Sequence, residues 1–192
     1  MTSSGSGTTV TVLPDAGPLI TLAYADALDL LLRPGWQVAL VDMVLEEVTG
    51  NATPTSERIA SWVTGHRLAV LPTKVFEHYK KAVGAAAPIR KSSLRELAIQ
   101  ETMNGFALHY PPKTGVFLFE DHKISRASFL LPDSCRKVST RAFLLFLEHE
   151  KLIPSSVEIE RRAIAAGRQF SQPFSHMSCP GSHARAPVTR GC

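Results

Sequence analysis

The sequence has few cysteines and no long apolar run. Three cysteines among 192 residues cannot form a closed set of disulfides, and no stretch is apolar for long enough to span a membrane. The first residues, MTSSGSGTT, lack the basic and apolar regions of a secretory signal. These absences predict a cytoplasmic protein with reduced thiols and no membrane partner.

The end of the chain has no acidic residue, no periodicity and three prolines. This stretch, SQPFSHMSCPGSHARAPVTRGC, covers residues 171–192 and predicts a disordered tail. Imidazole and thiolate are zinc ligands, and a zinc set can be drawn from His176, Cys179, His183 and Cys192. Because the flanking prolines and glycines come without core-forming residues, the plain tail is the favoured reading.

What the sequence does have is enough apolar content for a core. Hydrophobic residues make up 44% of the chain, and the mean hydropathy is near zero. Both values are typical of one soluble domain. The formal net charge is +4 and is unevenly spread. One basic stretch, with a single acid among its charges, contains Lys74, Lys80, Lys81, Arg90, Lys91 and Arg95. It is either a solvated helix face or a rim that attracts a polyanion.

Short β-branched runs alternate with helical patterns along the chain. The predicted strands are 9–13, 36–41, 68–71, 116–119 and 137–139. The predicted helices are 18–32, 43–49, 56–64, 74–83, 94–108, 140–148 and 155–168, several with N-caps at Asp42, Thr55, Thr73, Ser93 or Ser155, and the predicted loops are 84–88 and 110–115. This order predicts a three-layer α/β/α fold with a central, mainly parallel sheet of about five strands.

The same patterns divide the chain into four parts. Residues 1–8 are expected to be a disordered N-terminus and 9–150 the catalytic or binding domain. Residues 151–170 are expected to form a C-terminal helix packed on that domain or extending it, and 171–192 the tail.

Four acids follow predicted strands or lie near predicted helix starts: Asp15, Glu47, Glu96 and Asp121. The carboxyl ends of parallel strands form the edge where open α/β folds bind ligands. Carboxylates that converge there repel one another unless a cation lies between them. Oxygen ligands without His or Cys favour a hard divalent cation, Mg²⁺ or Mn²⁺.

Each acid also has a structural interpretation. Asp15 could cap the helix that Pro18 opens, and Glu47 could pair with a base at the surface. Glu96 has capping-box spacing from Ser93, and Asp121 could be a turn residue beside His122.

The motifs that contain these acids resemble those of PIN-domain nucleases. The stretches VLPDAGPLITLA, MVLEEV, SLRELAIQE, VFLFEDHKISR and KVSTRAFLLFL follow the order of that family's motifs over roughly residues 9–150. The third is similar to a Gly-Glu-x-Ala segment, with Arg95 in place of the glycine. The resemblance places Glu120 as a substitute for Asp121, and Ser139 and Thr140 near the site.

The resemblance implies a metal-dependent endoribonuclease. Asp15, Glu47, Glu96 and Asp121 would be catalytic as ligands of one or two Mg²⁺ or Mn²⁺ ions that activate water. No separate general base stands out, and a lone His such as His122 is more often structural. The RNA backbone would be bound by Lys91, Arg95, Lys123, Arg126 and Arg141.

The family includes toxins of toxin–antitoxin pairs, so the expected partners are RNA and, as further options, a small antitoxin protein and a second copy of the chain. The alternative is a catalytically silent PIN-like module that binds protein or RNA. Two other classes are disfavoured. No G-x-G-x-x-G follows a strand, as a dinucleotide-binding domain would require. A phosphotransfer Asp usually has a second acid two residues later, where this chain has Gly17.

Overall fold

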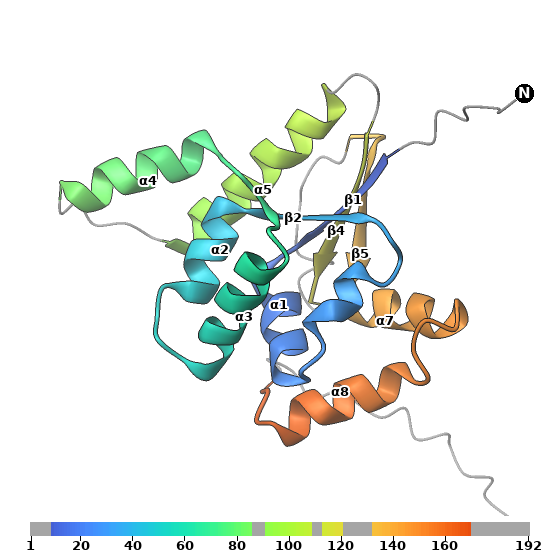
Figure 1. Cartoon of the computed structure of the whole chain (residues 1–192). Coiled ribbons are helices and arrows are strands. Elements are labelled where there is room, and N and C mark those ends of the chain that lie inside the picture. Colours follow the sequence, from blue (N-terminus) through green and yellow to red (C-terminus); the bar gives the residue numbers. More distant parts are fainter. Residues whose placement is uncertain (1–8, 86–90, 109–112, 121–131, 170–192) are drawn as a thin grey trace, which may run out of the picture.

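A computed structural model describes residues 9–85, 91–108, 113–120 and 132–169, with the side chains of 91–93 left out. Its elements are β1 (Thr9–Pro14), α1 (Ala16–Tyr24), the 3₁₀ helix η1 (Leu28–Leu32), β2 (Gln37–Val41), α2 (Asp42–Thr49), α3 (Pro54–Gly65), β3 (Ala69–Leu71), α4 (Lys74–Gly84), α5 (Lys91–Ala107), β4 (Lys113–Phe119), β5 (Cys135–Ser139), α7 (Thr140–His149) and α8 (Ser156–Ala165). Figure 1 shows their arrangement.

The five strands form one sheet in the order β3-β2-β1-β4-β5, and every pairing is parallel. Val12 of β1 lies opposite Val38 of β2 and Val116 of β4. The central strands are rich in β-branched and aromatic residues and are buried on both faces, as in Leu13 and Leu118. The predicted α/β fold class with a parallel five-stranded sheet is confirmed.

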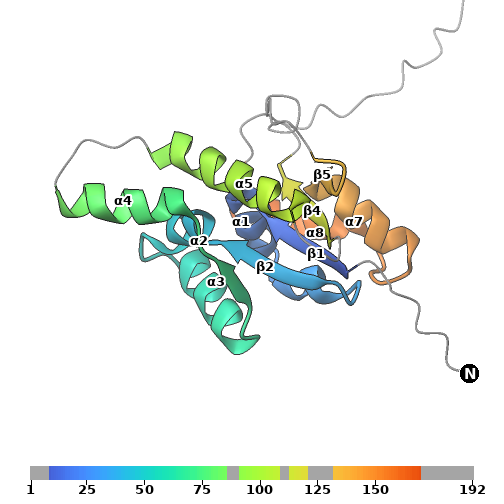
Figure 2. The same cartoon turned by 90° about the horizontal axis from the view of Figure 1, so that it is seen from above.

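Helices cover both faces of the sheet. Helix α5 packs on β2, β4 and β5, and Figure 2 shows it running alongside β4. In Figure 1, α4 and α5 lie towards the top, and α1, α3, α7 and α8 towards the bottom. Helix α1 packs on β1 and β4 and is itself covered by α3 and α8. None of the helices in the described ranges combines the length and apolarity needed to cross a bilayer.

The chain changes direction across the sheet at β1. The units β1-α1-β2 and β2-α2-α3-β3 extend the sheet to one side of β1, and β4 and β5 extend it to the other. The carboxyl ends of β1 and β4 are therefore adjacent, and the amide of Asp15 donates to the carbonyl of Leu118 at 2.9 Å. In open α/β folds this switch point is the usual ligand position.

The predicted single helix over 18–32 is wrong, because the segment forms α1 and then η1. Asp26 lies between them with φ of +53°, in the left-handed region. An α-helix cannot continue through that conformation, and Asp tolerates it better than most residues. The short polar side chain therefore allows the chain to turn back before the apolar run of η1.

Three of the five predicted N-caps also differ, those of α2, α3 and α5. The cap of α3 is Thr53 instead of Thr55, since Pro54 occupies the first turn and the Thr53 side chain accepts from the amide of Ser56. Helix α5 already includes Lys91, so Ser93 lies inside it rather than at its start. The caps of α4 and α8, Thr73 and Ser155, are as predicted.

The starts of β4 and α2 also differ from the prediction. Strand β4 begins at Lys113, inside the loop predicted over 110–115, because its early residues pair with β1. Asp42 is the first residue of α2 instead of its cap, and its carboxylate accepts from the amide and hydroxyl of Thr73 at 2.6 and 2.8 Å. Asp42 therefore ties the end of β2 to the start of α4.

The C-terminal helix α8 packs on α1 and α7. Glu148 at the end of α7 accepts from the amide and the hydroxyl of Ser156, and these bonds lower the pKa of Glu148 below its usual value. The N-terminal and C-terminal segments that the sequence predicts to be disordered lie outside the described residues. The four histidines and cysteines of the tail that could form a zinc set lie outside them as well.

Candidate functional site

Asp15 occupies the N-cap position of α1 but does not cap it with its side chain. Its backbone is extended, with φ of −72° and ψ of 172°, and the carboxylate makes no cap hydrogen bond. The side chain is only 2% exposed, and Oδ1 lies 3.2 Å from Nε of Arg95. The end of β1 thus presents a buried carboxylate to a cation from α5, so the capping interpretation does not account for this side chain.

Glu47 comes to the same arginine from α2. Both of its carboxylate oxygens accept from Nη1 of Arg95, 48 residues away in the sequence. The Glu47 side chain is 37% exposed. Glu47 therefore pairs with a base, as its structural interpretation predicts, and part of its carboxylate is exposed to solvent.

Arg95 lies between the two carboxylates, with only 10% of its side chain exposed. Burial favours its neutral form, but the charges of Asp15, Glu47 and Glu96 and the hydrogen bonding to Glu47 outweigh that effect, so the pKa of Arg95 is raised above its ordinary value. We call Asp15, Glu47 and Arg95 the Arg95 cluster. It carries two negative charges and one positive charge.

Glu96 is next to Arg95 in the chain but differs in placement. It is exposed, and its charge contributes to the raised pKa of Arg95 from a distance. Successive residues of a helix point about 100° apart, so Arg95 turns inward while Glu96 faces solvent. The salt bridges of Arg95 run to Asp15 and Glu47, 80 and 48 residues away in the sequence.

Glu120 follows β4 and is held by other residues. Thr21 Oγ1 donates to Glu120 Oε1 at 2.8 Å, and Arg168 Nη2 lies 3.6 Å from the same oxygen. Arg168 Nε also donates to Thr21 Oγ1 at 2.9 Å. We call Thr21, Glu120 and Arg168 the Arg168 cluster. Sequence reasoning missed Arg168, because nothing in its local pattern indicates a partner more than 40 residues away.

Gly17 makes room for Glu120. A Cβ atom at Gly17 would lie 2.3 Å from Cγ of Glu120, closer than any real contact allows. The glycine where a phosphotransfer site would have a second acid thus serves close packing between α1 and the end of β4.

Ser139 and Thr140 join the end of β5 to α7. The Ser139 hydroxyl caps α7 by accepting from the amide of Ala142 at 3.0 Å. Thr140 Oγ1 donates to the carbonyl of Phe119 at 3.1 Å. Both residues therefore lie at the carboxyl edge of the sheet, where the hydroxyl of each has a backbone partner.

Two of the predicted RNA-backbone side chains lie in the described ranges, Arg95 on α5 and Arg141 on α7. Arg95 is buried, and Arg141 is exposed in the first turn of α7, with Nε 4.0 Å from Glu160 Oε1. Asp121, Lys123, Arg126 and the side chain of Lys91 lie outside the described residues. Exposed lysines do occur on α4, which starts after β3 at the same edge of the sheet: Lys74, Lys80 and Lys81.

The Arg95 cluster has the donor chemistry of a hard-cation site. Two carboxylates from different elements converge on one positive charge, which here is the guanidinium of Arg95. Within the described ranges, no three Asp, Glu, His or Cys side chains come close enough together to hold a metal ion. Asp15 and Glu47 are the two carboxylates that Arg95 brings together, and Glu96 is exposed next to Arg95 in the sequence.

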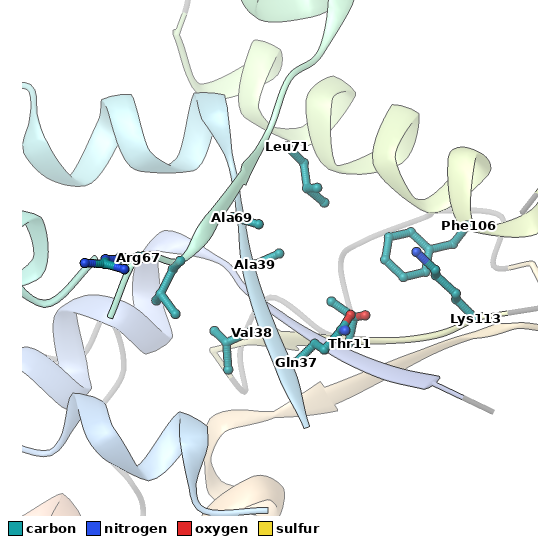
Figure 3. A pocket seen from close by; sticks show the side chains of 10 residues that line it. Thr11, Gln37, Val38, Ala39, Arg67, Ala69, Leu71, Phe106 and Lys113 are labelled. Carbon is teal, nitrogen blue, oxygen red and sulfur yellow. The ribbon is translucent and has the colours of Figure 1, made fainter. Parts of the chain in front are cut away.

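A groove of about 440 Å³ lies elsewhere on the sheet (Figure 3). It is lined by Thr11, Gln37, Val38, Ala39, Arg67, Leu68, Ala69, Leu71, Phe106 and Lys113. Figure 3 shows Phe106 of α5 and Lys113 on one flank and the side chains of β2 and β3 on the other. No member of the Arg95 cluster lines this groove, so it is separate from the candidate site.

No family model matches the chain, and no curated protein matches it. Among solved structures, the chain is similar to the PIN domain of RRP44 from T. brucei. That match has a TM-score of 0.46 and 16% sequence identity, and it covers 76% of this chain and 84% of the other.

Proposed function

We propose that this protein is a metal-dependent endoribonuclease that uses Asp15 and Glu47, together with Glu96 and Asp121, as its carboxylate set. One observation carries the proposal: the carboxylates of Asp15 and Glu47 share a single positive charge at the switch point of the sheet. Two carboxylates that contact the same guanidinium repel each other, and such a pair is suited to binding a cation. The order of the PIN-like motifs supports the same conclusion.

Mg²⁺ or Mn²⁺ is the proposed cofactor, because carboxylate oxygen is the ligand type that these ions favour. When bound, the ion would supply an activated water and neutralise charge on the phosphate. Asp15 is held in place by its buried position and by the bond from its amide to Leu118. Glu47 is the more exposed of the pair, at 37% against 2% for Asp15, and is therefore the carboxylate that a solvent-borne ion or phosphate reaches first.

RNA is the proposed substrate, and the exposed lysines of α4 support binding to a polyanion. Lys74, Lys80 and Lys81 lie on a helix that packs against α2 and α5, the two helices that carry Glu47 and Arg95. Such contacts bind the phosphate backbone without regard to sequence and weaken as salt increases. The toxin role, an antitoxin partner, a homodimer and a cytoplasmic location stay predictions.

The test is cleavage of a labelled single-stranded RNA by wild type and by Asp15→Asn, with Mn²⁺, with Mg²⁺ and with excess chelator. A neutral amide is a poor ligand for a hard cation, so turnover should fall about a hundredfold or more. Asn has nearly the same size as Asp, and Arg95 keeps its hydrogen bonds to Glu47, so circular dichroism should show a folded variant.

The matched control is Asp133→Asn. Asp133 is exposed and lies just before β5, at the amino ends of the strands and away from the carboxyl edge. It should leave turnover unchanged. Undiminished cleavage in excess chelator, or a folded Asp15→Asn protein with wild-type turnover, would remove the proposed mechanism.

The second candidate function is the catalytically silent module. One observation favours it: Arg95 already neutralises part of the carboxylate charge where the third motif of the family has a glycine. A silent module would fold normally and bind no Mn²⁺ at Asp15 and Glu47. Calorimetric titration with Mn²⁺ of wild type and of a folded variant without the Arg95 charge therefore separates the two functions without an RNA substrate.

A further inference from the structure

We propose that Arg95 is an internal counter-cation that holds the site closed, and that a divalent cation binds only when the guanidinium leaves Asp15 and Glu47. This regulation of the site rests on the proposed function. Arg95 thus acts as a positioning and gating residue, whereas the resemblance to PIN-domain nucleases implies that it binds the RNA backbone.

The contacts of the Arg95 cluster support this role. Asp15 Oδ1 lies 3.2 Å from Nε, and both oxygens of Glu47 accept from Nη1. The one guanidinium therefore uses two of its nitrogens to span carboxylates from the end of β1 and from α2. A divalent ion between these carboxylates would meet the positive charge of Arg95, and like charges at such distances repel strongly in a partly buried site.

The charge balance shows why displacement is feasible. The cluster has one more negative than positive charge, so Arg95 neutralises it incompletely, while a divalent ion would balance Asp15 and Glu47. The exchange does not require α5 to move as a whole, because only a long, unbranched side chain has to swing away. Glu47, whose carboxylate accepts from Nη1 of Arg95, is 37% exposed, so solvent lies close to the guanidinium end of the side chain.

Access to the cluster is one-sided. Asp15 is 2% exposed, Arg95 10% and Glu47 37%. An incoming ion therefore meets Glu47 first and reaches Asp15 only after Arg95 has moved. When a binding-competent form is a minor fraction of the protein, apparent affinity falls by that fraction.

The test is calorimetric titration with Mn²⁺ alone on wild type and on Arg95→Gln, which keeps a polar side chain and removes the positive charge. Loss of the competing cation should tighten Mn²⁺ binding by about tenfold or more. The melting temperature gives a second readout. Arg95→Gln should be less stable than wild type without metal, because the positive charge between Asp15 and Glu47 is lost, and Mn²⁺ should raise its melting temperature more than that of wild type.

The matched control is Arg162→Gln, an exposed arginine on α8, which should leave both readouts as in wild type. Folding of Arg95→Gln only in the presence of Mn²⁺ would support the proposal. If that variant stays unfolded with Mn²⁺, Arg95→Lys replaces it. Lysine keeps the charge but cannot span two carboxylates with a planar fork, so Mn²⁺ should bind more tightly than to wild type.

The outcomes separate this inference from the proposed function. Wild type and a folded Arg95 variant that bind Mn²⁺ with equal affinity would overturn the gating role and leave the nuclease proposal standing. No Mn²⁺ binding by wild type or by any folded Arg95 variant would overturn the metal site itself. Binding by the variant and not by wild type would support the gating role most directly.

Discussion

The Arg95 and Arg168 clusters are built alike and differ in charge and access. Each takes a carboxylate that directly follows a parallel strand, Asp15 after β1 or Glu120 after β4, and pairs it with an arginine from a distant helix or helix end. The Arg95 cluster contains a second carboxylate, Glu47, that is 37% exposed. In the Arg168 cluster Glu120 is 6% exposed and Arg168 18%.

This difference separates a structural ion pair from a candidate site. In the Arg168 cluster one negative and one positive charge cancel, and the hydroxyl of Thr21 bridges them. Such a pair is stable only while both partners remain, because a buried charge without a counter-charge is costly. In the Arg95 cluster two carboxylates face one arginine, and one of them, Glu47, is exposed to solvent. A carboxylate that follows a strand is therefore not by itself a sign of a metal ligand. The balance of charges around the carboxylate and its exposure to solvent also have to be considered.

The largest expected effect on stability is that of Glu120→Ala. The substitution leaves Arg168 next to Thr21 without the Glu120 carboxylate and removes packing against Gly17, so the free energy of unfolding should fall by about 2–4 kcal/mol. Urea unfolding followed by circular dichroism measures this change. Mn²⁺ affinity of the remaining folded protein should be close to that of wild type, and a lost Mn²⁺ site would place Glu120 among the ligands instead.

Gly17→Ala should act on the same cluster through packing alone. The new Cβ would lie 2.3 Å from Cγ of Glu120, so the carboxylate must shift away from Thr21, at about 1–3 kcal/mol. The matched control is Gly105→Ala in α5, where a Cβ meets nothing within 4 Å. That substitution should stabilise the helix by up to about 1 kcal/mol. Equal melting temperatures for the two variants would contradict the packing argument.

The smallest effect on stability is expected for Glu47→Gln. Its carboxylate is more than a third exposed, and Arg95 keeps Asp15 as a partner, so the free energy of unfolding should change by less than about 1 kcal/mol. Mn²⁺ binding should nevertheless weaken strongly, because an amide replaces a charged ligand. A loss of stability as large as that of Glu120→Ala would show that the Arg95 cluster is structural as well.

Local patterns in the sequence were sufficient for much of the fold. The alternation of β-branched runs such as TVTVL with helical patterns indicated a parallel sheet, because buried parallel strands and the helices between them have different periodicities. The errors lie where a single residue changes the backbone, as Asp26 does after α1, or where a helix begins before its strongest signal, as α5 does at Lys91.

The sequence by itself also determined that acids follow the strands, since Asp15 and Glu120 come directly after apolar runs. Only the tertiary structure decided their partners. Arg95 is adjacent to Glu96 in the chain, yet the packing of α5 against α2 turns it towards Asp15 and Glu47. Arg168 reaches Thr21 across 147 residues because α8 packs on α1. Charge pairing depends on distance in space, which a local pattern does not contain, and the docking of helices on the sheet sets that distance.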